Sequence, residues 1–193
     1  MRSYYYLSAS LPILAFGTAP PLSETEFLAR CREQLTDDDF RVLQACSLLP
    51  DDAELPSGSA AARFRSWETC LRNLLAGKRT VPGGEAGSYW RHEDDFFSEI
   101  APGVQEALAV GNVLEREKAL DQLRFRALDW LEAGHLFDLD HLCIYKLKLA
   151  LLAKYQPFDP ERGAANLDAI IAEVARRSGR AEAPEQPMQE NTI

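Results

Sequence analysis

Apolar residues recur at helical spacing along most of the chain, and the clearest pattern lies in two adjacent segments of the second half. Residues 113–134 have one apolar stripe opposite a charged face, which is typical of an amphipathic helix. The stripe contains Leu120, Leu123, Ala127, Trp130 and Leu131. Residues 137–155 are apolar on nearly every side, so we expect a helix that neighbours surround most of the way round. The short link between the two segments predicts an antiparallel pair.

Helix start signals in the first half predict a second hairpin. Ser23 and Glu26 form a capping box, in which each side chain can bind a free amide of the first turn, and they open a helix to about residue 35. Thr36 and the three aspartates after it predict another helix, because acidic side chains stabilise the positive end of a helix dipole. We expect this second helix to end at Pro50.

Two more segments of the first half have simple patterns. Residues 4–11 are aromatic and stop at Pro12, which predicts an extended arm packed on the body or a short strand. A helix with apolar residues at regular intervals begins at Ala60, and Gly77 is its expected end.

Proline and glycine divide the rest of the chain. Pro102-Gly103 is expected to separate an aromatic, acidic segment from a short helix. A last helix is expected over residues 160–177, with four apolar residues directed inward: Leu167, Ile170, Ile171 and Val174. Residues 179–193 are polar and are expected to form a disordered tail.

These elements predict an all-α protein with one domain, residues 1–178. We expect an irregular multi-helix bundle built from antiparallel helical hairpins, with an extended aromatic N-terminal arm. The length of 193 residues and the 46% hydrophobic share suffice for a real core. The formal net charge of -9 argues against a nucleic-acid surface, because phosphate contacts need clustered lysine and arginine. The apolar run at the N-terminus is poor for a signal peptide and no stretch is long enough to cross a membrane, so we expect a cytoplasmic protein without direct membrane insertion.

Much of the chain resembles an uncharacterised bacterial family. The resemblance rests on LEREKALDQLRFRALDWLE at residues 114–132 and on residues 137–174, with Tyr-Lys-Leu-Lys-Leu at 145–149 and Gly163 before the last helix. The start YYYLSASLP and residues 64–79 also look like that family.

Genes of this family lie among those of V/A-type rotary ATPases. The family is also distantly similar to the central-stalk subunit, called C in the A/V-type enzymes and d in the eukaryotic ones. That subunit is a longer, threefold-repeated funnel, whereas this chain has no exact internal repeat. The resemblance therefore implies a non-catalytic accessory or central-stalk-like protein that contacts V/A-type ATPase subunits. It would lie peripheral to the inner membrane only through that complex.

Cations interrupt the apolar helix of residues 137–155. His141 and Lys148 share a narrow polar line, which predicts a solvent slit, and Lys146 lies in the middle of an apolar face. A lysine at such a position snorkels, pairs with a carboxylate or marks a surface for a partner. We expect Lys146 to pair, and the nearest carboxylates in the sequence are Asp121, Asp129 and Glu132.

Basic residues cluster at residues 63–79 of an otherwise acidic chain, and we call this cluster the basic island. This island and the two lysines of the apolar helix make up the candidate surface for an acidic partner: Arg63, Arg65, Arg72, Arg79, Lys146 and Lys148. The island also contains Lys78. The alternative is that these charges lie on a helix face that is exposed to solvent and binds no partner.

Two groups of histidine and acidic residues could hold a metal ion. One is His92–Asp95, and the other comprises His135, Asp138, Asp140 and His141. Acidic residues at helix starts explain both groups more simply. No nucleophile elbow, metalloprotease helix or dinucleotide fingerprint occurs, so we expect neither enzyme activity nor a cofactor. A small metal-dependent hydrolase using His92 and Asp95 or Asp138 and His141, and a generic helical scaffold, are the alternatives.

Overall fold

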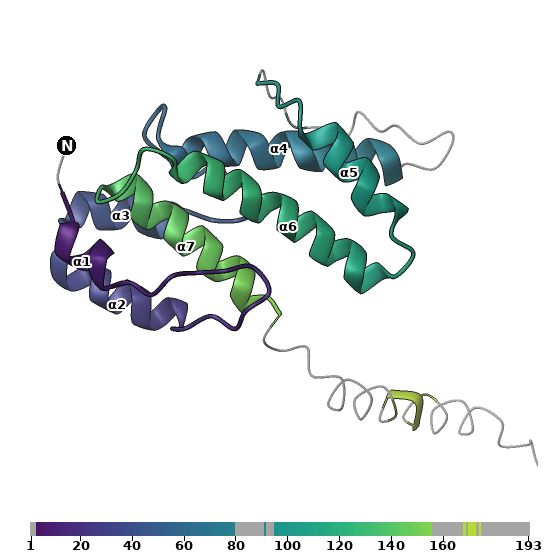
Figure 1. Ribbon diagram of the computed structural model, residues 1–193, viewed down its shortest axis with the longest axis horizontal. Coiled ribbons are helices and arrows are strands. Elements are labelled where there is room, and N and C mark those ends of the chain that lie inside the picture. Colours follow the sequence, from purple (N-terminus) through teal and green to yellow (C-terminus); the bar gives the residue numbers. More distant parts are fainter. Residues whose placement is uncertain are drawn as a thin grey trace, which may run out of the picture. The chain divides into compact units, whose positions relative to one another are not determined.

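The computed structural model describes residues 3–79, 91, 95–155, 168, 170–172 and 174 (Figure 1). Contacts divide the chain into two units, Met1–Lys154 and Tyr155–Ile193. Every regular element among the described residues is a helix, which confirms the predicted all-α class. The expected domain end at residue 178 and the expected tail, residues 179–193, lie outside the described residues.

Four helices of the first unit pack around α7. The described elements are α1 (Tyr5–Ser10), α2 (Glu24–Gln34), α3 (Asp37–Ala45), α4 (Ala60–Arg79), α5 (Ile100–Ala109), α6 (Val113–Glu132) and α7 (Leu139–Ala153). Helix α7 packs against α2, α3, α4 and α6, while α6 also packs against α4 and α5. Figure 1 shows α6 and α7 running in opposite directions side by side, so the predicted antiparallel pair is confirmed.

The apolar character of α7 follows from this central place. Every residue over 142–149 is buried, including Lys146 and Lys148. The helix starts where the Asp138 side chain accepts a hydrogen bond from the His141 amide at 2.9 Å. Before it, Gly134 has φ +93, a left-handed conformation that glycine adopts without strain and that ends α6.

Helix α6 buries most of its predicted stripe but not all of it. Leu120, Leu123, Ala127 and Leu131 are buried, as expected. Trp130 is 61% exposed, so its assignment to the core is wrong. The buried arc is shifted toward Asp121, Arg124 and Leu128 because α6 contacts α4 and α7 on that side.

A buried ionic network occupies this arc. Arg124 donates to both carboxylate oxygens of Glu68 on α4, at 2.8 and 3.0 Å, and to Asp121 at 2.7 Å. The other oxygen of Asp121 accepts from Lys154, which caps α7, at 2.7 Å. Arg72 completes the group with a 2.7 Å bond to Glu68. Asp121 and Arg124, three residues apart on α6, therefore pair in the core.

The neighbouring carboxylates favour the charged form of Arg124. Burial alone would lower the pKa of Arg124, but its hydrogen bonds to Glu68 and the charges of Glu68 and Asp121 raise that pKa above its ordinary value. Glu68 and Asp121 are each 1% exposed, so both depend on Arg124 and its neighbours for neutralisation.

The aromatic N-terminal segment forms a helix, so the predicted extended arm or strand is wrong for Tyr5–Ser10. Tyr4 and Leu7 lie one turn apart and are both buried, while Tyr6 points to solvent with 84% of its surface exposed. The Tyr4 hydroxyl donates to Asp39 of α3, and its amide donates to the carbonyl of Phe137 before α7. Helical spacing is the arrangement that buries these two side chains together.

Three helix ends differ from the sequence expectation. Helix α4 continues past Gly77 to Arg79. A glycine in a helix interior destabilises the helix by only about 1 kcal/mol relative to alanine, so it does not have to end the helix. Pro102 and Gly103 lie inside α5, since proline fits the first turn, where its missing N–H has no helical partner. A Cβ added at Gly103 would lie 2.7 Å from the Leu123 side chain, so this glycine permits close packing of α5 on α6.

Helix α3 ends at Ala45 and not at Pro50. Its N-terminus matches the prediction, since the Thr36 side chain accepts from the Asp39 amide. At the other end, the Lys146 amine binds the carbonyls of Leu43, Gln44 and Cys46 at 3.2, 3.0 and 2.9 Å. A cation from α7 thus satisfies the free carbonyls of the last turn and stabilises the negative end of the helix dipole.

In the second unit only part of the expected last helix is described. Asp168, Ile170, Ile171, Ala172 and Val174 are helical and exposed, so the expected inward packing of the three β-branched residues is wrong. Within the described residues, no helix has both the length and the hydrophobicity needed to cross a membrane.

The ionic network makes a direct prediction about stability. Arg124→Met should lower the free energy of unfolding by about 3–5 kcal/mol, because it leaves two buried carboxylates without their main cation. Arg126→Met on the exposed side of α6 is the matched control and should change stability by about 0.5 kcal/mol or less. Urea unfolding of both variants measures the difference. Equal losses would contradict the role given to Arg124.

Candidate functional site

The six predicted surface cations do not form one patch. Arg63 and Arg72 are exposed, Lys146 and Lys148 are buried, and Arg65 is half-buried. Arg79 ends α4, but its side chain lies outside the described residues. The candidate partner surface is therefore wrong for the two lysines, because both are enclosed by the helices around α7.

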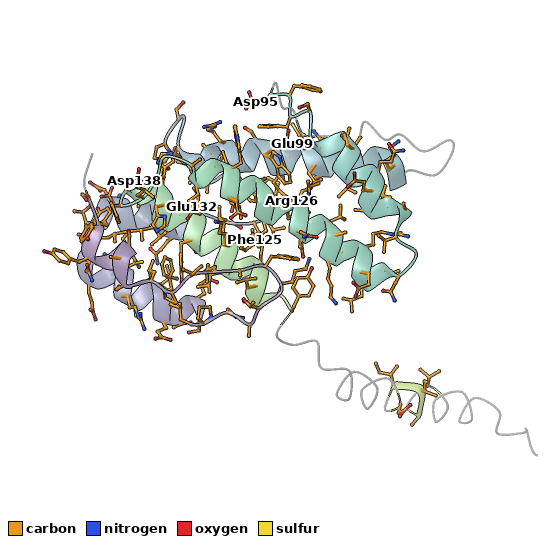
Figure 2. The ribbon with its side chains drawn as sticks, viewed as in Figure 1. Asp95, Glu99, Phe125, Arg126, Glu132 and Asp138 are labelled. Carbon is orange, nitrogen blue, oxygen red and sulfur yellow. The ribbon has the colours of Figure 1, made fainter. Side chains whose placement is uncertain are left out.

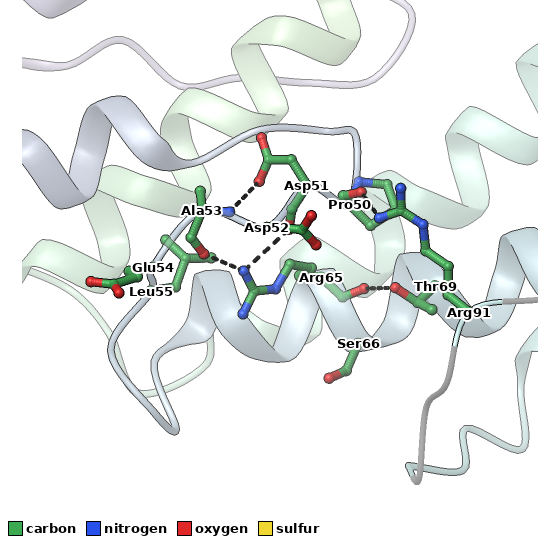
Figure 3. A pocket seen from close by; sticks show the side chains of 10 residues that line it. All are labelled: Pro50, Asp51, Asp52, Ala53, Glu54, Leu55, Arg65, Ser66, Thr69 and Arg91. Carbon is green, nitrogen blue, oxygen red and sulfur yellow. Dashed lines mark hydrogen bonds between the residues drawn. The ribbon is translucent and has the colours of Figure 1, made fainter.

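Arg65 and Arg91 hold a loop in place, as Figure 3 shows. Arg65 donates to the carbonyls of Asp51 and Ala53, and Arg91 donates to the carbonyl of Pro50. These residues line a cavity of about 1020 Å³ between the loop and α4, together with the Asp51, Asp52 and Glu54 side chains. Both guanidinium groups are thus occupied by backbone oxygens, and the cavity has both signs of charge.

Lys148 makes the carboxylate contacts that were expected for Lys146. Its amine lies 2.6 Å from Asp129 and 2.5 Å from Glu132, and 5.3 Å from the centre of the Phe125 ring. Lys146 instead binds the end of α3, and its nearest carboxylate is that of Glu24 at 3.7 Å. The prediction that Lys146 pairs with a carboxylate is therefore confirmed, but the expected partners on α6 are wrong, because Lys146 faces α2 and α3.

The predicted slit beside His141 and Lys148 is a cavity of about 490 Å³. Its walls come from the end of α6, from α7 and from residues 11–14 of the N-terminal segment, where the Tyr145 hydroxyl donates to the Pro12 carbonyl at 2.9 Å. His141 Nδ1 lies 3.1 Å from the Glu132 carboxylate. Burial alone would raise the pKa of Glu132, but hydrogen bonds from His141 and Lys148 lower it below its ordinary value.

A group of possible metal ligands lies at the start of α7. One ligand atom from each of His135, Asp138 and Asp140 falls within 4.8 Å of the others. Each carboxylate also has a structural partner. Asp138 binds the His135 ring at 2.7 Å and caps α7, and Asp140 accepts from the Ala60 amide at 2.9 Å. His141 is not part of this group, since its ring lies beside Glu132. His92 lies outside the described residues.

A groove lined by aromatic residues lies between residues 96–99 and α6. Phe96 is 89% exposed and Trp130 is 61% exposed, although each has a large apolar surface. With Phe97, Leu123 and Ala127 they line a cavity of about 610 Å³. Large aromatic side chains at the surface are typical of protein-binding sites.

Arginines frame this groove in an otherwise acidic chain. Arg126 lines it from α6 and has no ion-pair or hydrogen-bond partner among the described residues (Figure 2). The Arg63 guanidinium lies 5.0 Å from the centre of the Trp130 ring, a cation–π distance. Glu99 is the acidic residue of the lining, and its carboxylate accepts from the Trp67 indole at 3.0 Å.

Of the residues at this groove, only one had been named from the sequence as a candidate for partner binding. Arg63 belonged to the predicted basic island, but Trp130 was assigned to the core and Phe96 to an aromatic, acidic segment. The apolar periodicity of α6 does not distinguish a Trp130 that is buried in the core from one that lines a groove at the edge of the core. Trp130 is the stripe residue nearest to the charged face with Arg126 and Asp129, and this place at the edge of the stripe is the signal that could have put it at the surface.

The Glu132 contacts predict a pH-dependent contribution to stability. Because its pKa is lowered on folding, the carboxylate stabilises the fold above its ordinary pKa of 4.5 and loses that effect as the pH falls through the lowered value. Glu132→Gln should therefore cost ~1–3 kcal/mol near neutral pH and less in acid.

Thermal unfolding over a pH series measures this effect. Asp129→Asn is the control, because that side chain is 54% exposed and should contribute less. A loss in Glu132→Gln that stays constant from neutral to acidic pH would rule out the carboxylate charge as its cause.

The chain resembles a known family over its C-terminal half. Residues 94–178 match the model of a family described as "Protein of unknown function (DUF2764)". The match includes α6 and α7, the two helices that carry most of the sequence resemblance. No curated protein and no solved structure matches the chain. The expected similarity to an uncharacterised family is thus confirmed over residues 94–178.

Proposed function

We propose that this protein is a non-catalytic interaction protein of a bacterial V/A-type rotary ATPase, in an accessory or central-stalk-like role. It binds an acidic segment of an ATPase subunit in the groove between residues 96–99 and α6. The bound segment inserts an apolar side chain between Phe96 and Trp130, and its carboxylates meet Arg63 and Arg126.

The observation that carries this proposal is the pairing of exposed aromatic surface with arginines. Exposing Trp130 and Phe96 to water has a cost of roughly 25 cal/mol per Å² of apolar area, which a docked partner would remove. Trp and Arg are also the residue types that most often dominate binding energy at protein interfaces. The rest of the chain has a net negative charge, so the arginines favour an acidic partner at this place.

The choice of a rotary ATPase rests on the sequence resemblance. Residues 114–132 and 137–174 resemble a family whose genes lie among those of V/A-type ATPases. Trp130 and Arg126 belong to the first of these segments, so the groove is built partly from residues that carry the resemblance.

A non-catalytic role agrees with how the buried charges are used. Arg124, Glu68 and Asp121 bind one another, Lys146 caps α3, and Lys148 binds Glu132. These groups stabilise contacts between helices, and each is held by partners that would have to be displaced before it reacted.

Affinity capture from the native cells tests the proposal. Tagged full-length protein should recover rotary-ATPase subunits at low salt, and quantitative mass spectrometry measures the amount. Trp130→Ala combined with Arg126→Glu should reduce this recovery at least about tenfold, since two central contacts of roughly 1–2 kcal/mol each are lost.

A second double variant on α6 provides the control. Val113→Ala combined with Lys118→Glu changes charge by the same amount and also removes exposed apolar surface, but it lies outside the groove. It should retain wild-type recovery. If wild-type protein recovers no ATPase subunit, the partner is wrong, and if both double variants lose recovery equally, the groove is wrong.

A further inference from the structure

Two acidic side chains at the start of α7 lie close to one histidine of the link before it. His135 Nδ1 lies 2.7 Å from Asp138 Oδ2 and 3.8 Å from Asp140 Oδ2. The three side chains are 26%, 13% and 20% exposed, so the group is largely buried but can be reached from solvent. One ligand atom from each residue lies within 4.8 Å of the other two.

Helix capping accounts for only one oxygen of each carboxylate. Asp138 Oδ1 accepts from the His141 amide at 2.9 Å, and Asp140 Oδ1 accepts from the Ala60 amide at the start of α4, also at 2.9 Å. The Oδ2 atom of each carboxylate lies toward His135 instead. Carboxylates that bind metal ions in proteins are oriented in this way, by hydrogen bonds to the atoms that do not bind the metal.

These two carboxylates have little positive charge around them. The buried carboxylates of the ionic network each bind arginine or lysine. Among the described residues, however, no arginine or lysine lies within ion-pair distance of Asp138 or Asp140, and His135 supplies at most one positive charge. The dipole of α7 adds roughly half a charge at this end. Buried charges in proteins are paired or bind metal ions, so a bound cation fits this group.

We propose that His135, Asp138 and Asp140 bind one divalent transition-metal ion, of which Zn²⁺ is the example to test. Histidine nitrogen and aspartate oxygen both bind Zn²⁺ in proteins, at about 2.0–2.2 Å. Ligands at this distance in a tetrahedral site lie about 3.3 Å from one another, which falls between the two distances from His135 Nδ1 to the aspartate oxygens. Small rotations of the three side chains therefore bring them around an ion.

The ion connects several parts of the fold. His135 belongs to the link between α6 and α7, both aspartates belong to the start of α7, and Asp140 also binds the first amide of α4. The same link binds the N-terminal segment, since the Phe137 carbonyl accepts from the Tyr4 amide. None of the three ligands lines the groove between residues 96–99 and α6, so metal binding and partner binding can be tested separately.

Calorimetric titration of untagged full-length protein, freed of metal with EDTA, tests the site. We expect one Zn²⁺ per chain, and a melting temperature that rises by about 5 °C or more when free Zn²⁺ reaches about 100 times Kd. Mg²⁺ should bind at least about tenfold more weakly, because it prefers an octahedron of oxygen ligands and retains its water. Wild-type protein that binds no Zn²⁺ would overturn the proposal, and equally tight binding of Mg²⁺ would overturn the choice of ion.

Asparagine variants separate metal binding from helix capping. Asp138→Asn and Asp140→Asn keep an oxygen that accepts from the same amide but remove the charged ligand. Each should weaken Zn²⁺ binding at least about tenfold and should change the melting temperature of the metal-free protein little. Asp38→Asn is the matched control, because Asp38 is the second residue of α3 as Asp140 is of α7, and it should bind Zn²⁺ as the wild type does. Wild-type affinity in both α7 variants, or an equal loss in the control, would show that the site is wrong.

Discussion

The contact between Arg124 and two buried carboxylates fixes how the three long helices fit together. One guanidinium binds Glu68 from α4 and Asp121 from its own helix, and Asp121 in turn binds Lys154 at the end of α7. Directional bonds of this kind tolerate little sliding or rotation, whereas leucine contacts tolerate more. The network therefore determines the rotation of α6, and this rotation leaves Trp130 at the surface beside Arg63.

The two buried lysines of α7 have different roles because they bind different partners. Lys146 and Lys148 lie two residues apart and so project in different directions, one toward α3 and the other toward α6. One lysine stabilises the end of a helix and the other neutralises Glu132. A helix surrounded on all sides can contain charges only where a neighbour supplies an opposite charge or a row of free carbonyls.

Features set by neighbouring residues in the chain could be predicted, and those set by distant residues could not. The starts at Ser23 and Thr36 and the apolar α7 follow from capping chemistry and periodicity. The end of α3 depends on an amine about a hundred residues further along the chain, and the exposure of Trp130 depends on contacts with α4. Of the groove, only Arg63 could be named from the sequence, because residues 96–99 and α6 meet only through the folding of α5.

The capping of α3 by Lys146 also bears on the order in which the chain folds during synthesis. Residues 37–45 leave the ribosome long before Lys146. Tyr4 is likewise synthesised long before Phe137, whose carbonyl accepts a hydrogen bond from the Tyr4 amide. Until α7 emerges, α3 lacks the cation for its last turn, and both α2 and α3 lack the surface that buries Phe27 and Leu43. The first half must therefore remain incompletely packed while the second is made, and its exposed apolar side chains are a natural target for chaperones.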